Sequence, residues 1–151
     1  MREAKALCFV DTSILVCAFD RLEGDKHARA AELIESLWIS KKGVLSTQVL
    51  QEFHLALMQS GGLGINLRVS REILEAFSHW PVVTPRADDL LQVIGFQEKF
   101  GLSFYDASII QSALAGQCSV LYSEGLTSGQ SYAGVKIVNP FLEAASGKDG
   151  D

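Results

Sequence analysis

Hydrophobic and polar positions along the chain follow two alternating patterns. Short, mostly apolar runs at 6–10, 44–46, 82–84, 119–122 and 135–138 are typical of buried strands. Between them, apolar residues at helical spacing predict helices over 14–20, 25–40, 47–60, 69–80, 86–100 and 103–115. Strands that alternate with helices are joined by right-handed crossovers into a parallel sheet. The pattern therefore predicts an α/β fold, a three-layer α/β/α sandwich with a central parallel sheet.

Some element boundaries are predicted from single residues. Asp25 is expected to cap the helix over 25–40. The helix over 69–80 is expected to end before Pro81, because a residue that precedes proline is disfavoured in the helical conformation. The segment 123–134 is rich in turn-forming residues and is interpreted as a loop.

Composition favours one packed domain. The chain has 151 residues, of which 48% are hydrophobic and 21% charged, so we expect a single domain over 1–144 and a flexible tail over 145–151. Its apolar runs are too short to cross a bilayer and none resembles a signal peptide, so we expect a cytoplasmic protein with no membrane partner. Cys8, Cys17 and Cys118 are odd in number and have apolar neighbours, which favours reduced core residues.

The net charge and the spacing of the histidines argue against two classes of function. A net charge of −5 argues against a simple electrostatic nucleic-acid binder, which usually has a basic excess. None of the three histidines has a second histidine or cysteine at ligand spacing, so a zinc or non-haem iron site lacks ligands. Phosphate contacts would depend on local basic residues, most of which are by default solvated surface charges: Arg21, Lys26, Lys41, Lys42, Arg68, Arg71, Arg86 and Lys99.

The first candidate site residue is Asp11, the single acid in the apolar stretch 6–19. It directly follows the first predicted strand, and ligands of open α/β sheets bind at the carboxyl ends of strands. The alternative is that Asp11 only caps the following helix, a role that Thr12 or Ser13 could fill equally well.

Two more acids occupy positions where their helices otherwise carry apolar residues. Asp106 begins a stripe at helical spacing that should face the sheet, and a buried carboxylate is costly unless it is compensated. The alternative is a capping box with Ser103. Glu52 lies beside the apolar stripe of its own helix, and the alternative for it is an ordinary boundary position.

Taken together, the three acids predict a metal site. Each lies near the carboxyl end of a strand, so one cleft could hold all three. Converging carboxylates repel one another unless a cation neutralises them, and clusters of hard oxygen ligands suit Mg²⁺ or Mn²⁺. A bound cation can activate water and stabilise charge on a phosphoryl group, so phosphodiester hydrolysis fits best.

Four segments carry a family resemblance, in this order and spacing: FVDTSIL, LSTQVLQEF, LSFYDASII and LYSEGLTSGQSYAGVKIVNPF. Together they resemble the signature stretches of PIN-domain ribonucleases, especially the VapC-like toxins, over nearly the whole chain up to about Leu142. The resemblance implies a three-layer α/β/α fold and Mg²⁺- or Mn²⁺-dependent endonucleolytic cleavage of RNA. By motif, Asp11, Glu52 and Asp106 fall on the family's three acidic positions.

The resemblance also implies supporting residues and partners. Thr12 or Ser13 matches the hydroxyl that commonly helps to hold metal-bound water or phosphate. The family implies frequent homodimers and often a cognate antitoxin. Such an antitoxin would be expected to insert near Asp11 and Asp106 and to supply a basic side chain where metal or phosphate normally sits.

The chain departs from the family pattern at a fourth position. Family members usually carry an aspartate two residues after the Ser or Thr that follows the fourth strand, whereas here Ser123 is followed by Glu124 and then Gly125. Glu124 is then a further candidate metal ligand, displaced by one position, or the site works with three acids.

Three hypotheses remain open. The first is a metal-dependent endoribonuclease, the toxin of a toxin–antitoxin pair. The second is a catalytically weak PIN-domain module that binds RNA or a protein partner, favoured by Gly125 and by the low basicity. The third, a phosphatase of the haloacid dehalogenase type, ranks last, because it needs a second Asp where Ser13 stands.

Overall fold

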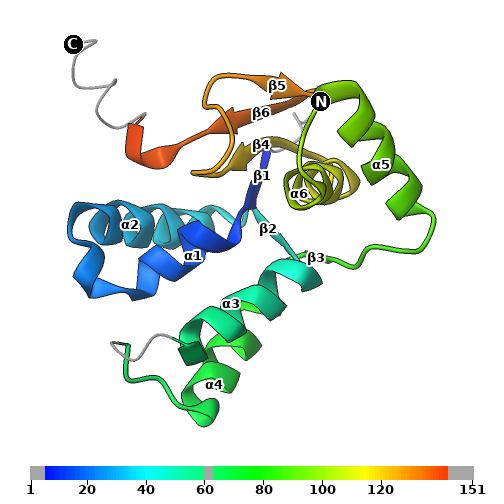
Figure 1. Cartoon of the computed structure of the whole chain (residues 1–151). Helices are drawn as coiled ribbons and strands as arrows, with labels where there is room; N and C mark the ends of the chain where they lie inside the picture. The colour runs from blue at the N-terminus through cyan, green and yellow to red at the C-terminus, as the bar shows by residue number, and fades with distance from the viewer. Residues whose placement is uncertain (1–5, 60–62, 143–151) are drawn as a thin grey trace, which may run out of the picture.

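The computed structural model describes residues 6–59 and 63–142, and a six-stranded sheet forms its centre (Figure 1). The strand order is β3-β2-β1-β4-β6-β5. The parallel strands are β1 (Leu7–Val10), β2 (Gly43–Ser46), β3 (Val82–Val83), β4 (Cys118–Tyr122) and β6 (Val135–Val138). Short β5 (Ser131–Tyr132) runs antiparallel to β6. The predicted α/β/α sandwich is confirmed, with a mostly parallel sheet.

Helices cover both faces of this sheet (Figure 1). They are α1 (Thr12–Phe19), the 3₁₀ turn η1 (Arg21–Glu23), α2 (Asp25–Ser40), α3 (Thr47–Gln59), α4 (Leu67–Phe77), α5 (Asp89–Phe100) and α6 (Phe104–Ala115). In the described part of the chain, no helix is both long and apolar enough to span a bilayer.

The order of the strands determines which helices share a face. The chain steps outward from β1 to β2 to β3 and then returns past them to β4. Right-handed crossovers in opposite directions place their helices on opposite faces. Helices α1 to α4 therefore cover one face, and α5 and α6 cover the other. The change of direction falls between neighbouring strands β1 and β4, where the loops that follow the two strands diverge.

The core has its centre at β1. Phe9 and Val10 are fully buried, as the apolar run predicted. On the α1–α4 side, an aromatic cluster of Phe19, Trp38, Phe53, Phe77 and Trp80 joins the helices to one another. The three cysteines are buried and unbridged, as predicted, and burial raises the pKa of the Cys118 thiol to about 12.

Gly43 shows why β2 begins with a glycine. A Cβ atom at this position would lie 2.4 Å from the Trp80 ring, closer than any side chain can approach. Because the ring occupies that space, the first residue of β2 must lack a side chain. The aromatic cluster and the sheet thus fix each other's position.

Several boundaries differ from the predictions. Asp25 does not cap α2: Gly24 holds the N-cap position, and Asp25 lies in the first turn. Helix α4 begins two residues earlier than predicted, because the Asn66 side chain accepts a hydrogen bond from the Val69 amide, and it ends at Phe77 instead of Trp80.

Strand β5 was not predicted from the sequence. Its hairpin to β6 turns at Ala133 and Gly134, which both have positive φ, the geometry of a tight two-residue turn. Alanine rarely adopts that conformation, so the sequence carries a weak turn signal. The predicted tail over 145–151 and the domain limit at 144 lie outside the described residues.

Candidate functional site

The candidate site lies where the loops that follow β1 and β4 diverge. In open α/β sheets such a point is where ligands bind, because the two loops leave a crevice between them. Asp11 follows β1, and Ser123, Glu124 and Gly125 follow β4. An open pocket of about 420 Å³ lies here, lined by Asp11, Thr12, Ser13, Tyr105, Asp106, Glu124 and Gly125. The volume is sufficient for a hydrated cation and a phosphate group.

Asp11 is the most buried acid of the pocket, with 6% of its surface exposed. Its Oδ1 accepts hydrogen bonds from the Thr12 amide at 2.7 Å and from the Tyr105 hydroxyl at 2.8 Å. Its Oδ2 accepts one from the Ser123 hydroxyl at 3.0 Å. Asp11 is also the N-cap of α1. Asp11 therefore caps α1 and lines the pocket at the same time, so the two interpretations from the sequence are compatible. Its Oδ2 retains an acceptor position for a ligand in the pocket.

The environment of Asp11 disfavours its charge. Burial is the main cause that raises the pKa of its carboxyl above the usual range, and the negative charge of Asp106 raises it further. The hydrogen bonds from Tyr105, Thr12 and Ser123 act in the opposite direction. Repulsion between two acids in one pocket is relieved when a cation binds between them.

Asp106 lies in the first turn of α6, with its side chain partly exposed in the pocket. The Ser103 hydroxyl accepts a hydrogen bond from the Asp106 amide at 3.1 Å, so Ser103 caps the helix. This cap uses the backbone amide of Asp106 and does not involve its carboxylate. The carboxylate is therefore available to a ligand.

Glu52 on α3 is not one of the residues that line the pocket, but it is connected to them. Its Oε1 accepts a hydrogen bond from the Thr12 hydroxyl at 3.3 Å. The same hydroxyl lies 3.2 Å from the Tyr105 hydroxyl, which donates to Asp11. The two adjacent hydroxyl groups therefore lie between the carboxylates of Glu52 and Asp11, and each donates to one of them.

Tyr105 is a site residue that the sequence analysis missed. Burial and the negative charge of Asp11 raise the pKa of its hydroxyl, so Tyr105 stays protonated and can donate its hydrogen bond at neutral pH. An aromatic residue in the first turn of a helix is usually a packing residue, so its type gave no reason to expect a role in the site. The only signal in the sequence was its position directly before Asp106 in the third motif.

The loop after β4 supplies the remaining candidates. The Ser123 side chain is fully buried, donates to Asp11 and accepts from the Gly125 amide at 3.2 Å. Glu124 lines the pocket and forms an ion pair with Lys26 of α2. Ser13 lines the pocket beside Thr12. Of the residues proposed from sequence, Glu52 and Ser123 lie outside the pocket lining.

The donor chemistry of this pocket suits a hard divalent cation. The polar atoms of its lining side chains are all oxygens, from carboxylates and hydroxyls, and these are the ligands that Mg²⁺ and Mn²⁺ prefer. Within residues 6–59 and 63–142, no three His, Cys, Asp or Glu side chains are close enough together to form a metal cluster. Asp11 and Asp106 would then provide the first contacts, and water would complete the coordination of Mg²⁺.

Replacement of Asp11 by Asn is expected to stabilise the fold at neutral pH. A carboxyl group with a raised folded-state pKa stabilises the protein while protonated, and that stability is lost as the pH rises through the folded pKa. Asn removes the buried charge, while its oxygen can accept from Thr12 and Tyr105 and its amide can donate to Ser123. We expect a gain of roughly 0.5–2 kcal/mol, or about 2–4 °C in melting temperature per kcal/mol.

Thermal melts of the parent and Asp11→Asn across pH measure this difference, which should shrink as the pH falls towards the folded pKa of Asp11 and below. Asp88→Asn, the same change at an exposed position on the other face, is the matched control and should shift stability by less than about 0.5 kcal/mol. A lower melting temperature for Asp11→Asn at neutral pH would mean that the charged carboxylate stabilises the fold.

Comparisons with known proteins agree with this architecture. Solved structures that the chain resembles include a toxin–antitoxin complex from Klebsiella pneumoniae, with a TM-score of 0.64, 16% identity and coverage of 88% of this chain and 97% of that one. VapC20 of Mycobacterium tuberculosis, a sarcin-ricin loop cleaving toxin, has a TM-score of 0.61 and 24% identity, with coverage of 85% and 98%. FitAcB from Neisseria gonorrhoeae has a TM-score of 0.57 and 14% identity, with coverage of 89% and 99%.

At these identities the likeness establishes the fold. No curated protein sequence is significantly similar to the chain. The family model of the PIN domain matches residues 8–125, a range that begins in β1 and ends in the loop after β4. The match therefore includes every residue proposed for the site, and the chain belongs to the PIN domain family.

Proposed function

We propose that this protein is a Mg²⁺- or Mn²⁺-dependent endoribonuclease that hydrolyses RNA phosphodiester bonds and is the toxin of a toxin–antitoxin pair. The observation that carries the proposal is the convergence of Asp11 and Asp106 in one pocket between the loops that follow β1 and β4. Membership of the PIN domain family and likeness to toxin structures support a nuclease toxin.

Each residue has a distinct role in this proposal. Asp11 and Asp106 would hold the cation, which when bound would activate water and stabilise charge on the phosphoryl group. Tyr105, Thr12 and Ser123 fix the Asp11 carboxylate through their hydrogen bonds. Glu52 is held beside Thr12 and acts from the edge of the pocket, as a further ligand through water or as the group that accepts a proton from the attacking water.

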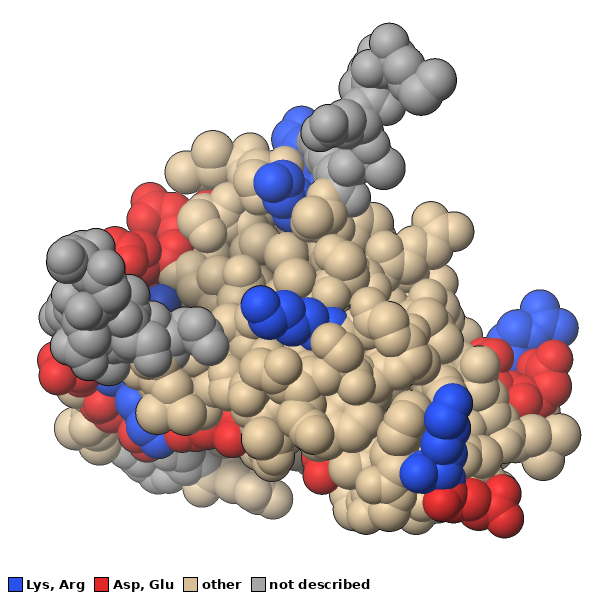
Figure 2. All heavy atoms as spheres, turned by 90° about the horizontal axis from the view of Figure 1, so that it is seen from above, with Lys and Arg blue, Asp and Glu red and all other residues tan. Residues whose placement is uncertain are grey.

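RNA as the substrate is supported by the likeness to VapC20, a toxin that cleaves the sarcin-ricin loop. On the face shown in Figure 2, lysine and arginine side chains of the described residues form no broad basic patch, and several of them lie beside acids. We infer that RNA binding depends on the metal and a few local contacts more than on a broad basic surface.

The proposal of an antitoxin partner is supported by the same comparisons. The Klebsiella pneumoniae structure is a toxin–antitoxin complex, so an antitoxin is proposed here too. A homodimer and a cytoplasmic location stay predictions. Analytical ultracentrifugation of the full chain at micromolar concentration tests the homodimer, and a monomer there would contradict it.

The second candidate function is a catalytically weak PIN-domain module that binds RNA or a protein partner. The specific observation in its favour is Gly125, which stands at the pocket where family members usually carry a fourth acid. With one acid fewer, the pocket has less negative charge to hold a cation.

A cleavage assay separates the two functions. Purified protein should cut single-stranded RNA with Mg²⁺ or Mn²⁺, stop when EDTA is added and resume when the cation is restored in excess. Cleavage that continues in EDTA would contradict the metal mechanism. RNA binding in a gel-shift assay without cleavage under any divalent cation would favour the binding module.

A further inference from the structure

Glu124 is not a free carboxylate, although it lines the pocket. Lys26, the second residue of α2, forms an ion pair with its Oε2. The described residues contain two ion pairs, and the other one, between Arg86 and Asp88, lies away from the pocket lining. The two partners of the first pair are 98 residues apart in sequence, so the fold itself brings a cation to the displaced fourth acid.

Lys26 is also held from a second side. Its ammonium lies 5.4 Å from the centre of the Phe141 ring, a distance at which the ring face attracts a cation. Phe141 follows β6, whereas Glu124 follows β4, so two strand ends fix the ammonium at the pocket. The hydrogen bond to Glu124, together with the negative charge of that carboxylate, raises the pKa of Lys26.

We infer that Lys26 competes with the divalent cation for Glu124, and that this ion pair sets the metal affinity of the pocket. The inference rests on the proposed metal-dependent function and assigns a role to a residue outside the pocket lining. Lys26 is a positioning residue here, because it acts through Glu124.

The energetics allow both states of Glu124. The two side chains are 44% and 33% exposed, and ion pairs between solvent-exposed side chains contribute little to stability. A doubly charged cation that is held by Asp11 and Asp106 attracts a nearby carboxylate more strongly than a partly solvated ammonium does. While the pair is formed, however, the negative charge of Glu124 is largely neutralised, which weakens the attraction of the pocket for a cation.

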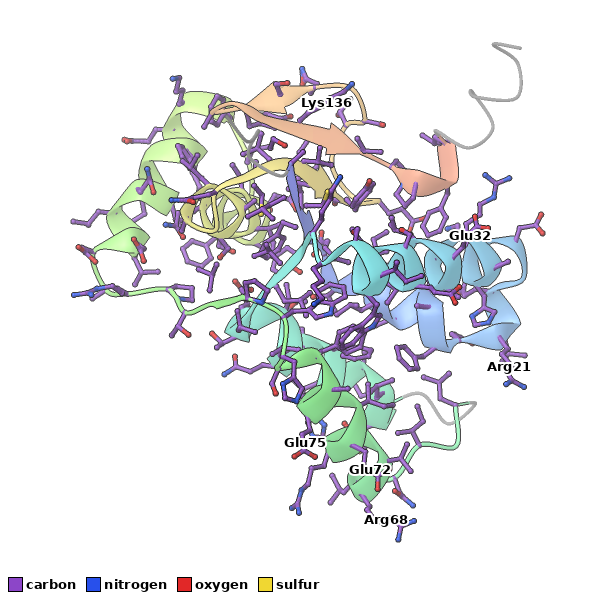
Figure 3. The ribbon with its side chains drawn as sticks, turned by 180° about the vertical axis from the view of Figure 1, so that it is seen from behind. Arg21, Glu32, Arg68, Glu72, Glu75 and Lys136 are labelled. Carbon is purple, nitrogen blue, oxygen red and sulfur yellow. The ribbon has the colours of Figure 1, made fainter. Side chains whose placement is uncertain are left out.

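The test measures Mn²⁺ binding to the full chain by calorimetry. Lys26→Met should tighten binding by roughly 3- to 5-fold, the upper part of the range for an exposed ion pair. Lys136→Met is the matched control, since this exposed lysine on β6, labelled in Figure 3, does not line the pocket but carries the same charge. It should change binding much less. Phe141→Leu, which keeps the lysine, should have a smaller effect in the direction of Lys26→Met.

A double-mutant cycle with Glu124→Gln completes the test. In that background Lys26→Met should change the Mn²⁺ affinity no more than Lys136→Met does. An equal effect of Lys26→Met with and without the Glu124 carboxylate, or an equal effect of the two lysine changes in the parent, would overturn the inference. If the parent binds Mn²⁺ and Asp106→Asn abolishes that binding, the proposed function survives either result; if the parent shows no such binding, both proposals fail together.

Discussion

Asp106→Asn is expected to reduce RNA cleavage by roughly 100-fold or more, the size of effect seen when one charge-stabilising group is removed from an active site. The substitution keeps the shape of the side chain but removes one of the two charges that hold the cation in the pocket. Stability should change little, because the cap of α6 is the Ser103 hydroxyl bonded to the backbone amide of residue 106. The lost interaction with the helix dipole costs about 0.3–1 kcal/mol.

The measurement pairs single-turnover cleavage rates with thermal melts. Asp89→Asn is the matched control: Asp89 also lies in a first helical turn, that of α5, and its carboxylate accepts a hydrogen bond from the Arg86 amide, away from the pocket. It should cut RNA at the rate of the parent. If Asp106→Asn does so too, the proposed site is wrong; if it unfolds, the main role of Asp106 is structural.

The fold was predictable because burial leaves a direct trace in the sequence. The run that ends at Val10 has few polar residues because β1 is covered on both faces, and the helix over 25–40 was predicted with the bounds that α2 has. The missed strand, β5, has two residues and depends on a turn with positive φ at Ala133. Its pairing is determined by the adjacent β6, which no local pattern reveals.

The positions of the acids could also be anticipated, but their partners could not. An acid directly after a buried strand indicates the end of the sheet where Asp11 lies. The Tyr105 hydroxyl that donates to Asp11 comes from 94 residues away, and Lys26 reaches Glu124 over 98 residues. Such contacts depend on how α2 and α6 pack beside the loops after β1 and β4, so they become visible only in three dimensions.

The second large effect is expected from a gain of function. Gly125→Asp should tighten divalent-metal binding by on the order of 1 kcal/mol, about 5-fold, and raise the cleavage rate, because it places a carboxylate at the family's fourth acidic position. A side chain fits at this position: a Cβ atom on Gly125 meets no atom within 4 Å, and its φ lies outside the left-handed region that favours glycine.

Two features would oppose this gain: a strained backbone at residue 125, and a Glu124 carboxylate that already binds the cation. Backbone strain is absent at Gly125, and the Glu124 carboxylate is paired with Lys26. Gly125→Asn is the matched control, since it adds the same volume without the charge. Calorimetric titration of Mn²⁺ into both variants and into Glu124→Gln distinguishes the outcomes. If Gly125→Asp binds Mn²⁺ no more tightly than Gly125→Asn, the new carboxylate does not reach the cation; if Glu124→Gln also leaves the affinity unchanged, Asp11, Glu52 and Asp106 form the complete acidic site.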